Sequence, residues 1–188
     1  MRTRSVAALA ALVVLVGVLA ACTSSSPDTA PVPTTASSPY ICSGVQARGM
    51  TLALGGDVTR EATDGRWGAD SQYFSCTVVR SGDAKGSALV TSVPTQTFPG
   101  PADQDEAIAA LATSYGGDAI EADADGAGYV REGDHPAAAW ICHGMTTRVE
   151  LQGVDVEGRD AATDARSLLV STLPWACGSE PAPGADDS

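Results

Sequence analysis

The sequence predicts an α+β domain, in which three helices cover an antiparallel sheet of about five strands. The predicted order of elements is αββαβββα, with two disulfide bonds. Three observations carry this prediction: four cysteines lie beyond residue 40, apolar residues recur at helical spacing in three segments, and apolar and polar residues alternate in short segments between them. This order implies an antiparallel sheet with helices packed on it.

The first part of the domain predicts a helix and a hairpin. Ser43 can cap a helix that runs to about Leu54, where two glycines end it. Residues 72–80 alternate between apolar and polar side chains, which indicates a strand. A glycine-containing turn leads to a second strand over residues 87–93, so these two strands should form a hairpin.

The clearest helix follows, between Asp103 and Gly116. Asp103 and Glu106 form a capping-box-like pair at its start, and Gly116 lies where a left-handed C-cap belongs. The apolar residues at positions 108, 111, 112 and 115 fall on one face. The spacing therefore predicts a helix that packs on one side only.

The last third of the domain predicts three short strands and a closing helix. The strands lie near residues 127–131, 137–143 and 146–152. The last two flank Gly144 and should form a hairpin with one buried and one solvent-exposed face. The helix over residues 159–173 has an apolar face, and Pro174 is expected to stop it.

The N-terminus has the layout of a secretory signal. Arg2 and Arg4 precede an apolar run from Val6 to Ala21, with small residues just before Cys22. The stretch Leu19-Ala20-Ala21-Cys22 resembles the lipobox of bacterial lipoproteins. This resemblance implies that residues 1–21 are a lipoprotein signal peptide, that cleavage follows, and that Cys22 carries the lipid.

An uncleaved membrane helix is the alternative interpretation of this segment. Its sixteen mostly apolar residues come close to the roughly 17 to 25 that cross a bilayer. A membrane span does not require small residues before a cysteine, and Thr23 onward lacks a basic stop-transfer flank. We therefore expect a lipid-anchored protein on the extracytoplasmic face of the cell membrane.

Composition divides the remaining chain into three parts. Residues 22–39 are rich in Ser, Thr and Pro and predict a flexible tether. Residues 40–178 are expected to form a single extracytoplasmic domain, and residues 179–188 a disordered tail. The formal net charge of −12 disfavours nucleic acid and polyanionic envelope polymers as partners, because phosphate binding relies on Lys and Arg.

The domain contains four cysteines that should form two disulfides: Cys42, Cys76, Cys142 and Cys177. Three pairings are possible. The first two are 34 residues apart and the last two 35 apart, which favours two local bridges of matching size, Cys42 with Cys76 and Cys142 with Cys177. A zinc site is the rival interpretation, but the paired Cys-x-x-Cys spacing is lacking.

Short motifs in this domain resemble small cysteine-containing lipoproteins of high-GC Gram-positive bacteria, many of which have no known function. The motifs are Cys42-Ser43-Gly44, Gly126-Ala127-Gly128-Tyr129 and Trp175-Ala176-Cys177-Gly178. The resemblance implies a fold type and a compartment, and no activity.

One acidic stretch has the spacing of an EF-hand calcium loop. Glu121, Asp123, Asp125 and Gly126 are followed by Glu132, matching positions 1, 3, 5, 6 and 12. An EF-hand loop lies between two helices. Here glycines interrupt the preceding helix, and the sequence Gly-x-x-Pro prevents a following one. We interpret the stretch as an acidic turn before a strand and expect no metal site.

The sequence indicates no catalytic residues and no cofactor. His135 lies in a predicted loop, and His143 is expected on the strand face opposite Trp140 and Cys142. No nucleophile elbow, phosphate loop or metalloprotease motif accompanies them. The tryptophans at positions 67, 140 and 175 could line a pocket or an interface, but core positions are the favoured interpretation.

Three functions follow from these observations. The favoured one is a non-enzymatic interaction or ligand-binding module that binds another envelope protein or a small ligand. The second is a carrier of an apolar or lipid ligand, which needs a large cavity between sheet and helices. The third is an envelope hydrolase, which needs a cleft where His and carboxylates converge.

Overall fold

A computed structural model describes residues 28–67, 73–82, 85–97, 100–101 and 103–184. These residues form the helices α1 (Ala47–Leu54), α2 (Gln104–Tyr115) and α3 (Ala161–Ala176). The strands are β1 (Tyr40–Cys42), β2 (Val45–Gln46), β3 (Val58–Gly65), β4 (Phe74–Arg80), β5 (Ser87–Pro94), β6 (Gln96–Thr97), β7 (Gly100–Pro101), β8 (Asp118–Ile120), β9 (Ala127–Arg131), β10 (Ala137–Cys142) and β11 (Met145–Gln152).

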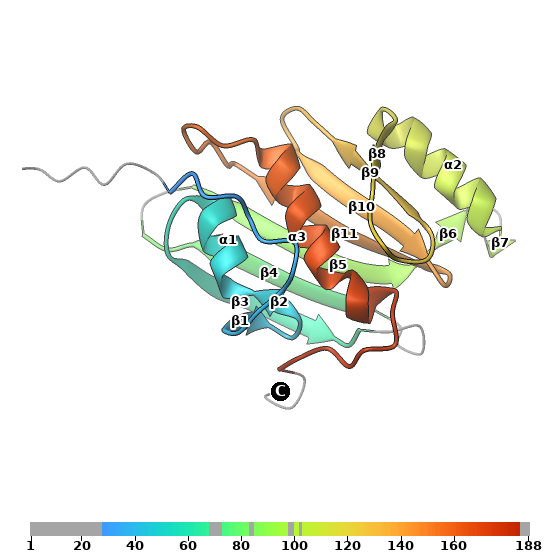
Figure 1. The fold of residues 1–188 in the computed structure, drawn as a ribbon, viewed down its shortest axis with the longest axis horizontal. Coiled ribbons are helices and arrows are strands. Elements are labelled where there is room, and N and C mark those ends of the chain that lie inside the picture. The colour runs from blue at the N-terminus through green and yellow to red at the C-terminus, as the bar shows by residue number, and fades with distance from the viewer. Residues whose placement is uncertain (1–27, 68–72, 83–84, 98–99, 102, 185–188) are drawn as a thin grey trace, which may run out of the picture.

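Seven of these strands form one antiparallel sheet in the order β3-β4-β5-β11-β10-β9-β8 (Figure 1). The chain builds it as two meanders, β3-β4-β5 and β8-β9-β10-β11, and β5 joins the meanders by pairing with β11. Two small two-stranded sheets, β1-β2 and β6-β7, lie outside it. The prediction of an antiparallel α+β domain with three helices is confirmed.

The sheet has two more strands than the sequence predicted, β3 and β8. All five expected strands are present, as β4, β5, β9, β10 and β11. The two missed strands are the edges of the sheet, where only one neighbour supplies hydrogen bonds. Seven of the eight residues of β3 are exposed and most are polar, so it has no apolar alternation. Strand β8 is too short to show a period.

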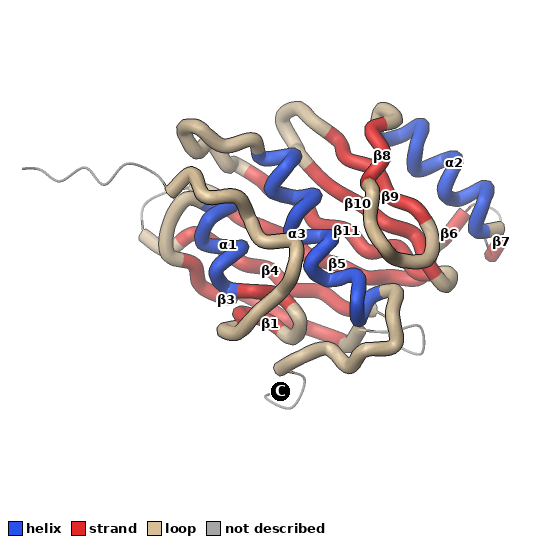
Figure 2. Tube along the Cα trace, viewed as in Figure 1, coloured by secondary structure: helices blue, strands red, loops and turns tan. Residues whose placement is uncertain are grey.

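Helices α1 and α3 cover one face of the sheet (Figures 1 and 2). Side chains from both helices and from the central strands fill the space between them and are almost completely buried: Met50, Leu54, Phe74, Leu151, Leu168 and Leu169. Helices α1 and α3 can approach closely because residue 49 of α1 is Gly49. A Cβ at that position would lie only 2.9 Å from the side chain of Leu168 in α3, which is too close. The layer between sheet and helices is therefore a packed core.

Helix α2 packs on the opposite face, over β9 and β10. Strand β10 is buried on both faces: Ala138 and Trp140 point into the main core, and Ala137 and Ala139 form a second small core with Tyr115 of α2. The strand can pack on both sides because its outward residues are alanines, which leave room for the helix. This face of the sheet is covered by α2 only at one end.

The helix boundaries differ from expectation at two places. Residue 43 does not cap α1; residues 40–46 form the β1-β2 hairpin, and α1 begins at Ala47. Pro174 does not stop α3, which continues to Ala176. A proline removes one backbone donor, but in the last turn few hydrogen bonds remain to be lost. The N-cap at Asp103, which accepts from Asp105 N and Glu106 N, and the left-handed C-cap at Gly116 are confirmed.

Both disulfides have the expected pairing, Cys42–Cys76 and Cys142–Cys177. The first joins the β1-β2 hairpin, rather than a helix start, to β4. The second joins the end of β10 to the residue that follows α3. Each bridge therefore ties a chain segment outside the sheet to a central strand.

The chain just before the domain lies against the two helices, as a segment that we call the N-terminal strap (residues 28–39). Val32 is 4% exposed and belongs to the main core, and the Gln46 side chain donates to the Pro33 carbonyl at 2.8 Å. The prediction of a flexible tether is therefore wrong for residues 28–39. Composition alone did not indicate this, because the strap is held by one buried valine and by hydrogen bonds to its backbone carbonyls, which are independent of side-chain type.

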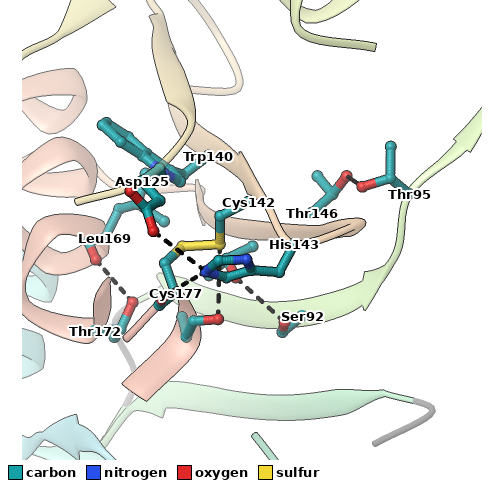
Figure 3. The surroundings of a disulfide bond; sticks show 12 residues. Ser92, Thr95, Asp125, Trp140, Cys142, His143, Thr146, Leu169, Thr172 and Cys177 are labelled. Carbon is teal, nitrogen blue, oxygen red and sulfur yellow. Dashed lines mark hydrogen bonds and ion pairs between the residues drawn. A yellow bond between two sulfur atoms is a disulfide. The ribbon is translucent and has the colours of Figure 1, made fainter. Parts of the chain in front are cut away.

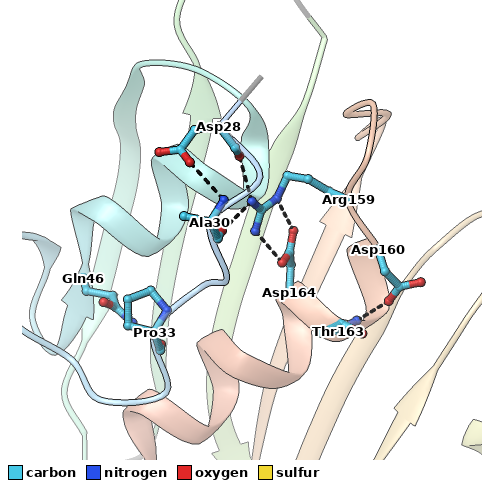
Figure 4. Close-up of polar contacts among 8 residues, drawn as sticks. All are labelled: Asp28, Ala30, Pro33, Gln46, Arg159, Asp160, Thr163 and Asp164. Atoms are coloured by element: carbon cyan, nitrogen blue, oxygen red, sulfur yellow. Dashed lines mark hydrogen bonds and ion pairs between the residues drawn. The ribbon is translucent and has the colours of Figure 1, made fainter. Parts of the chain in front are cut away.

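The N-terminal end of α3 holds this strap through one arginine (Figure 4). Arg159 donates from Nε and Nη2 to the two carboxylate oxygens of Asp164, at 2.8 and 2.7 Å. Its Nη1 donates to the carbonyls of Asp28 and Ala30. Both charged side chains are buried, with 4% and 6% of their surface exposed. The helix start itself is capped by Asp160, which accepts from Thr163 N at 2.6 Å.

The C-terminal segment also contacts the domain. Gly44 N donates to the Pro183 carbonyl at 2.8 Å, which holds residues 179–184 beside the β1-β2 hairpin. The expected disordered tail is thus wrong for these residues, and positions 185–188 lie outside the described residues.

Candidate functional site: a groove at the C-terminal end of α3

An open groove of about 780 Å³ runs beside the last turns of α3. We call it the C-terminal groove. Four segments line it: residues 34–35 of the strap, the β8-β9 loop at 122–125, the α3 residues Val170, Leu173 and Pro174, and residues 177–180. Its volume lies in the range of small-ligand sites, about 300 to 1,000 Å³. The walls come from parts of the chain that are far apart in sequence.

The groove has an apolar part, which we call its floor, and this part is continuous with the core. Ala122, Ala124 and Val170 are half-buried and pack against core residues, and Leu173 is only 3% exposed. Pro174 has no amide hydrogen, so it cannot donate to the carbonyl of Val170 as a helical residue would. The floor therefore offers apolar surface to a ligand, and its contacts with the core keep it in place.

Trp140 fixes the β8-β9 loop that forms one wall (Figure 3). Its Nε1 donates to the Asp125 carbonyl at 2.8 Å. Its ring lies over Gly128 of the neighbouring strand, where a Cβ would come within 2.5 Å of Trp140 Cε3. Gly128 thus makes room for the ring, and the ring holds the loop.

His143 does not line the groove, but it connects two of the residues that do, Asp125 and Cys177. It has a positive φ of 49°, which ends β10 and turns the side chain toward the disulfide. Its Nε2 lies 2.9 Å from the Cys177 carbonyl and 3.7 Å from Asp125 Oδ2 (Figure 3). Strand alternation predicted the face opposite Trp140 and Cys142; this prediction is wrong, because the left-handed residue breaks the alternation.

This arrangement places a histidine and a carboxylate beside one groove, which is one requirement of a hydrolase. In a catalytic triad, however, the acid and the nucleophile use different ring nitrogens of the histidine. Here the carbonyl and Asp125 both face Nε2, and Nδ1 has no hydrogen-bond partner among the residues that the structure describes. Through these two Nε2 contacts, His143 connects β10, the β8-β9 loop and the segment that follows α3.

The rim of the groove carries three carboxylates and no Lys or Arg: Asp123, Asp125 and Glu180. Asp125 is the one that His143 approaches. The side chains of Asp123 and Glu180 have no hydrogen bond or ion pair within the described part of the chain. Their charges are therefore hydrated and available to a ligand.

The calcium-loop spacing does not translate into a site. Strand β9 lies between Asp125 and Glu132 and places them near opposite ends of an extended segment, roughly 20 Å apart at about 3.3 Å per residue. Glu132 instead borders a second pocket, of about 570 Å³, near the N-terminal end of α3. Within the described ranges, no group of three or more His, Cys, Asp or Glu side chains could hold a metal ion.

The remaining candidate residues lie elsewhere. Trp140 and Trp175 are buried, and Trp67 stacks on Phe74 with ring centroids 4.0 Å apart, so the core interpretation of the tryptophans holds. His135 is exposed in the β9-β10 loop, and its carbonyl accepts from Arg131. Cys22 lies outside the described residues. Among those that are described, no helix combines the length and the apolar character of a membrane span.

Sequence reasoning missed the groove itself. The EF-hand comparison drew attention to residues 121–126, but as metal ligands, and Val170 and Glu180 had no signal at all. A groove built from three regions far apart in sequence, residues 34–35, 122–125 and 170–180, leaves no local pattern. No protein-family model matches this chain, and neither a curated protein nor a solved structure is significantly similar to it.

Proposed function

We propose that this chain is a lipid-anchored lipoprotein of the extracytoplasmic membrane face, and that it acts as a non-enzymatic binding module through the C-terminal groove. The observation that carries the proposal is a groove with an apolar floor and firmly held walls. A buried tryptophan, a histidine tie and a disulfide fix those walls, so a ligand would find the site largely formed.

The packed core favours this proposal over a carrier of an internal apolar ligand. The space between the sheet and the helices is filled by large side chains such as Met50, Leu168 and Leu169. A carrier would need that space for its cargo. The groove is open to solvent, which suits a ligand that belongs to another molecule.

The lipid anchor is proposed from the lipobox ending at Cys22. Replacing Cys22 by Ser in the full chain should abolish labelling by a clickable fatty acid and release the protein from the membrane fraction. Two or more acyl chains suffice for stable anchoring. Unchanged labelling of Cys22→Ser would contradict the proposal.

Groove binding is tested in the native membrane with the full chain. A photo-reactive amino acid in place of Thr34, an exposed lining residue, should give a discrete cross-linked product after illumination. The same amino acid at Glu157, exposed near the other end of α3, is the matched control. The product should disappear when Ser179→Trp fills the groove. Equal products at both positions would contradict a specific groove ligand.

A further inference from the structure

We infer that the C-terminal groove binds a basic, amphipathic peptide segment of a partner protein. This inference rests on the proposed function and names the chemistry of its ligand. It follows from two independent properties of the groove, the apolar floor and the charge of the rim.

The floor selects for apolar side chains. Ala122, Ala124 and Val170 present small aliphatic groups, and the pyrrolidine ring of Pro174 is exposed beside them. Small floor residues leave depth for a partner's larger side chain, such as leucine. Burying one such side chain excludes water from apolar surface on both molecules.

The rim selects for positive charge. Asp123, Asp125 and Glu180 lie around this floor, with no Lys or Arg among the lining residues to neutralise them. Elsewhere in the chain, Asp103 and Asp160 accept hydrogen bonds from helix amides, and Asp164 is paired with Arg159. The carboxylates of Asp123 and Glu180 have no such role in the described residues, so a cationic partner would give them one.

The charge of the whole chain acts in the same direction. The formal net charge of −12 attracts cations at long range and repels acidic segments. Two copies of this chain would repel one another through the groove, since both would bring carboxylates to it. A basic segment is therefore favoured over self-association.

An open groove also favours a chain segment over a free small cation. A free diamine could satisfy the carboxylates, but it would leave the apolar floor in contact with water. A peptide with alternating basic and apolar residues can satisfy both, because successive side chains of an extended segment point in opposite directions.

The test measures peptide affinity for the full acylated chain in nanodiscs of phosphatidylcholine, with empty nanodiscs as the blank. The probe is a short fluorescent peptide of lysine and leucine. It is compared with peptides in which glutamate replaces lysine or serine replaces leucine, and with a free diamine. We expect the lysine-leucine peptide to bind at least tenfold more tightly than the other three.

The charge contribution is isolated by variants. Asp123→Asn with Glu180→Gln should weaken binding of the lysine-leucine peptide at least fivefold at low salt and much less at 1 M salt. Asp134→Asn with Asp155→Asn removes the same charge from the second pocket and is the matched control, with little expected change. These four residues are exposed, so the variants should fold normally.

The outcomes distinguish the basic-peptide inference from the proposed function on which it rests. Three results would overturn the basic-peptide inference. The lysine and glutamate peptides could bind equally tightly, both double variants could lose peptide affinity equally, or the diamine could bind tightly while the lysine-leucine peptide does not. If a Thr34 cross-link still forms and Ser179→Trp still prevents it, the proposed function stands without this inference. Loss of both the cross-link and the peptide binding would overturn both.

Discussion

The two ends of α3 use polar groups in opposite ways. At the N-terminal end, Arg159 and Asp164 are buried, and Arg159 forms four hydrogen bonds, to Asp164 and to the strap. At the C-terminal end, Asp123 and Glu180 are exposed and unpaired within the described residues. Buried charge must be compensated inside the protein, whereas exposed charge can remain available for a partner.

The difference extends to what holds each end in place. The N-terminal end, which we call the closed end, is held by charged hydrogen bonds to a strap that crosses it and covers the Arg159–Asp164 pair (Figure 4), although the second pocket borders the same end. The C-terminal end is held by a disulfide and by ties from Trp140 and His143 to the walls (Figure 3), which leave the surface between the walls open. One helix can therefore anchor the fold at one end and support a groove at the other.

The largest expected effect is at the closed end. Asp164→Ala leaves the buried Arg159 without its carboxylate and should lower the free energy of unfolding by about 3 to 5 kcal/mol. Urea denaturation measures this loss. The double variant Arg159→Met with Asp164→Leu removes both charges and should recover most of it; a double variant as unstable as Asp164→Ala would contradict the role of unpaired charge.

The second effect is at the open end. Replacing Cys142 and Cys177 by Ala should cost about 2 to 5 kcal/mol of unfolding free energy and weaken groove binding, because the bridge fixes residues 177–180. The matched control replaces Cys42 and Cys76, which close a loop of nearly the same length. It should cost similar stability and leave the groove intact. Equal loss of binding in both variants would refute a local role for the second bridge.

A smaller effect is expected from the tryptophan tie. Trp140→Phe keeps most of the ring but removes the hydrogen bond to the Asp125 carbonyl, which should cost roughly 0.5 to 1.5 kcal/mol. Amide hydrogen exchange should rise in residues 121–126 and stay unchanged in the strap. Trp67→Phe removes a comparable bond to the Ser43 carbonyl and is the control. Exchange that rises in the strap as well would show that the two ends are coupled.

The smallest effect concerns pH at the closed end. The hydrogen bond from the Thr163 amide lowers the pKa of Asp160 from its ordinary value of 3.8. A lowered folded-state pKa adds stability above the unfolded-state pKa, and this contribution is lost as the pH falls through the folded-state value. Asp160→Asn can still cap the helix but cannot titrate. As the pH falls from about 5 to about 2, the unfolding free energy of Asp160→Asn should therefore rise relative to that of the natural protein. A difference between the two free energies that stays constant over this range would contradict the prediction.

Local patterns predicted the interior of the domain better than its borders. Strands such as β4 and β11 show an alternation that only one buried face produces, and Asp103 and Gly116 mark α2 by their own backbone chemistry. The edge strand β3 was missed because its polar residues face water. Pro174 was read as a helix end, but core contacts of Leu173, Trp175 and Ala176 hold the last turn.

Periodicity, caps and cysteine spacing are properties of short stretches of chain, and they sufficed to predict the α+β class and the three helices and to favour the two disulfide pairings that the structure has. The position of the strap, the direction of His143 and the existence of the groove depend instead on how distant parts of the chain pack together. The strap and the groove join residues more than 100 positions apart, such as Arg159 and Asp28, or Thr34 and Glu180, and His143 meets a carbonyl 34 positions away. Contacts at that separation depend on how the layers pack, and no local pattern records them.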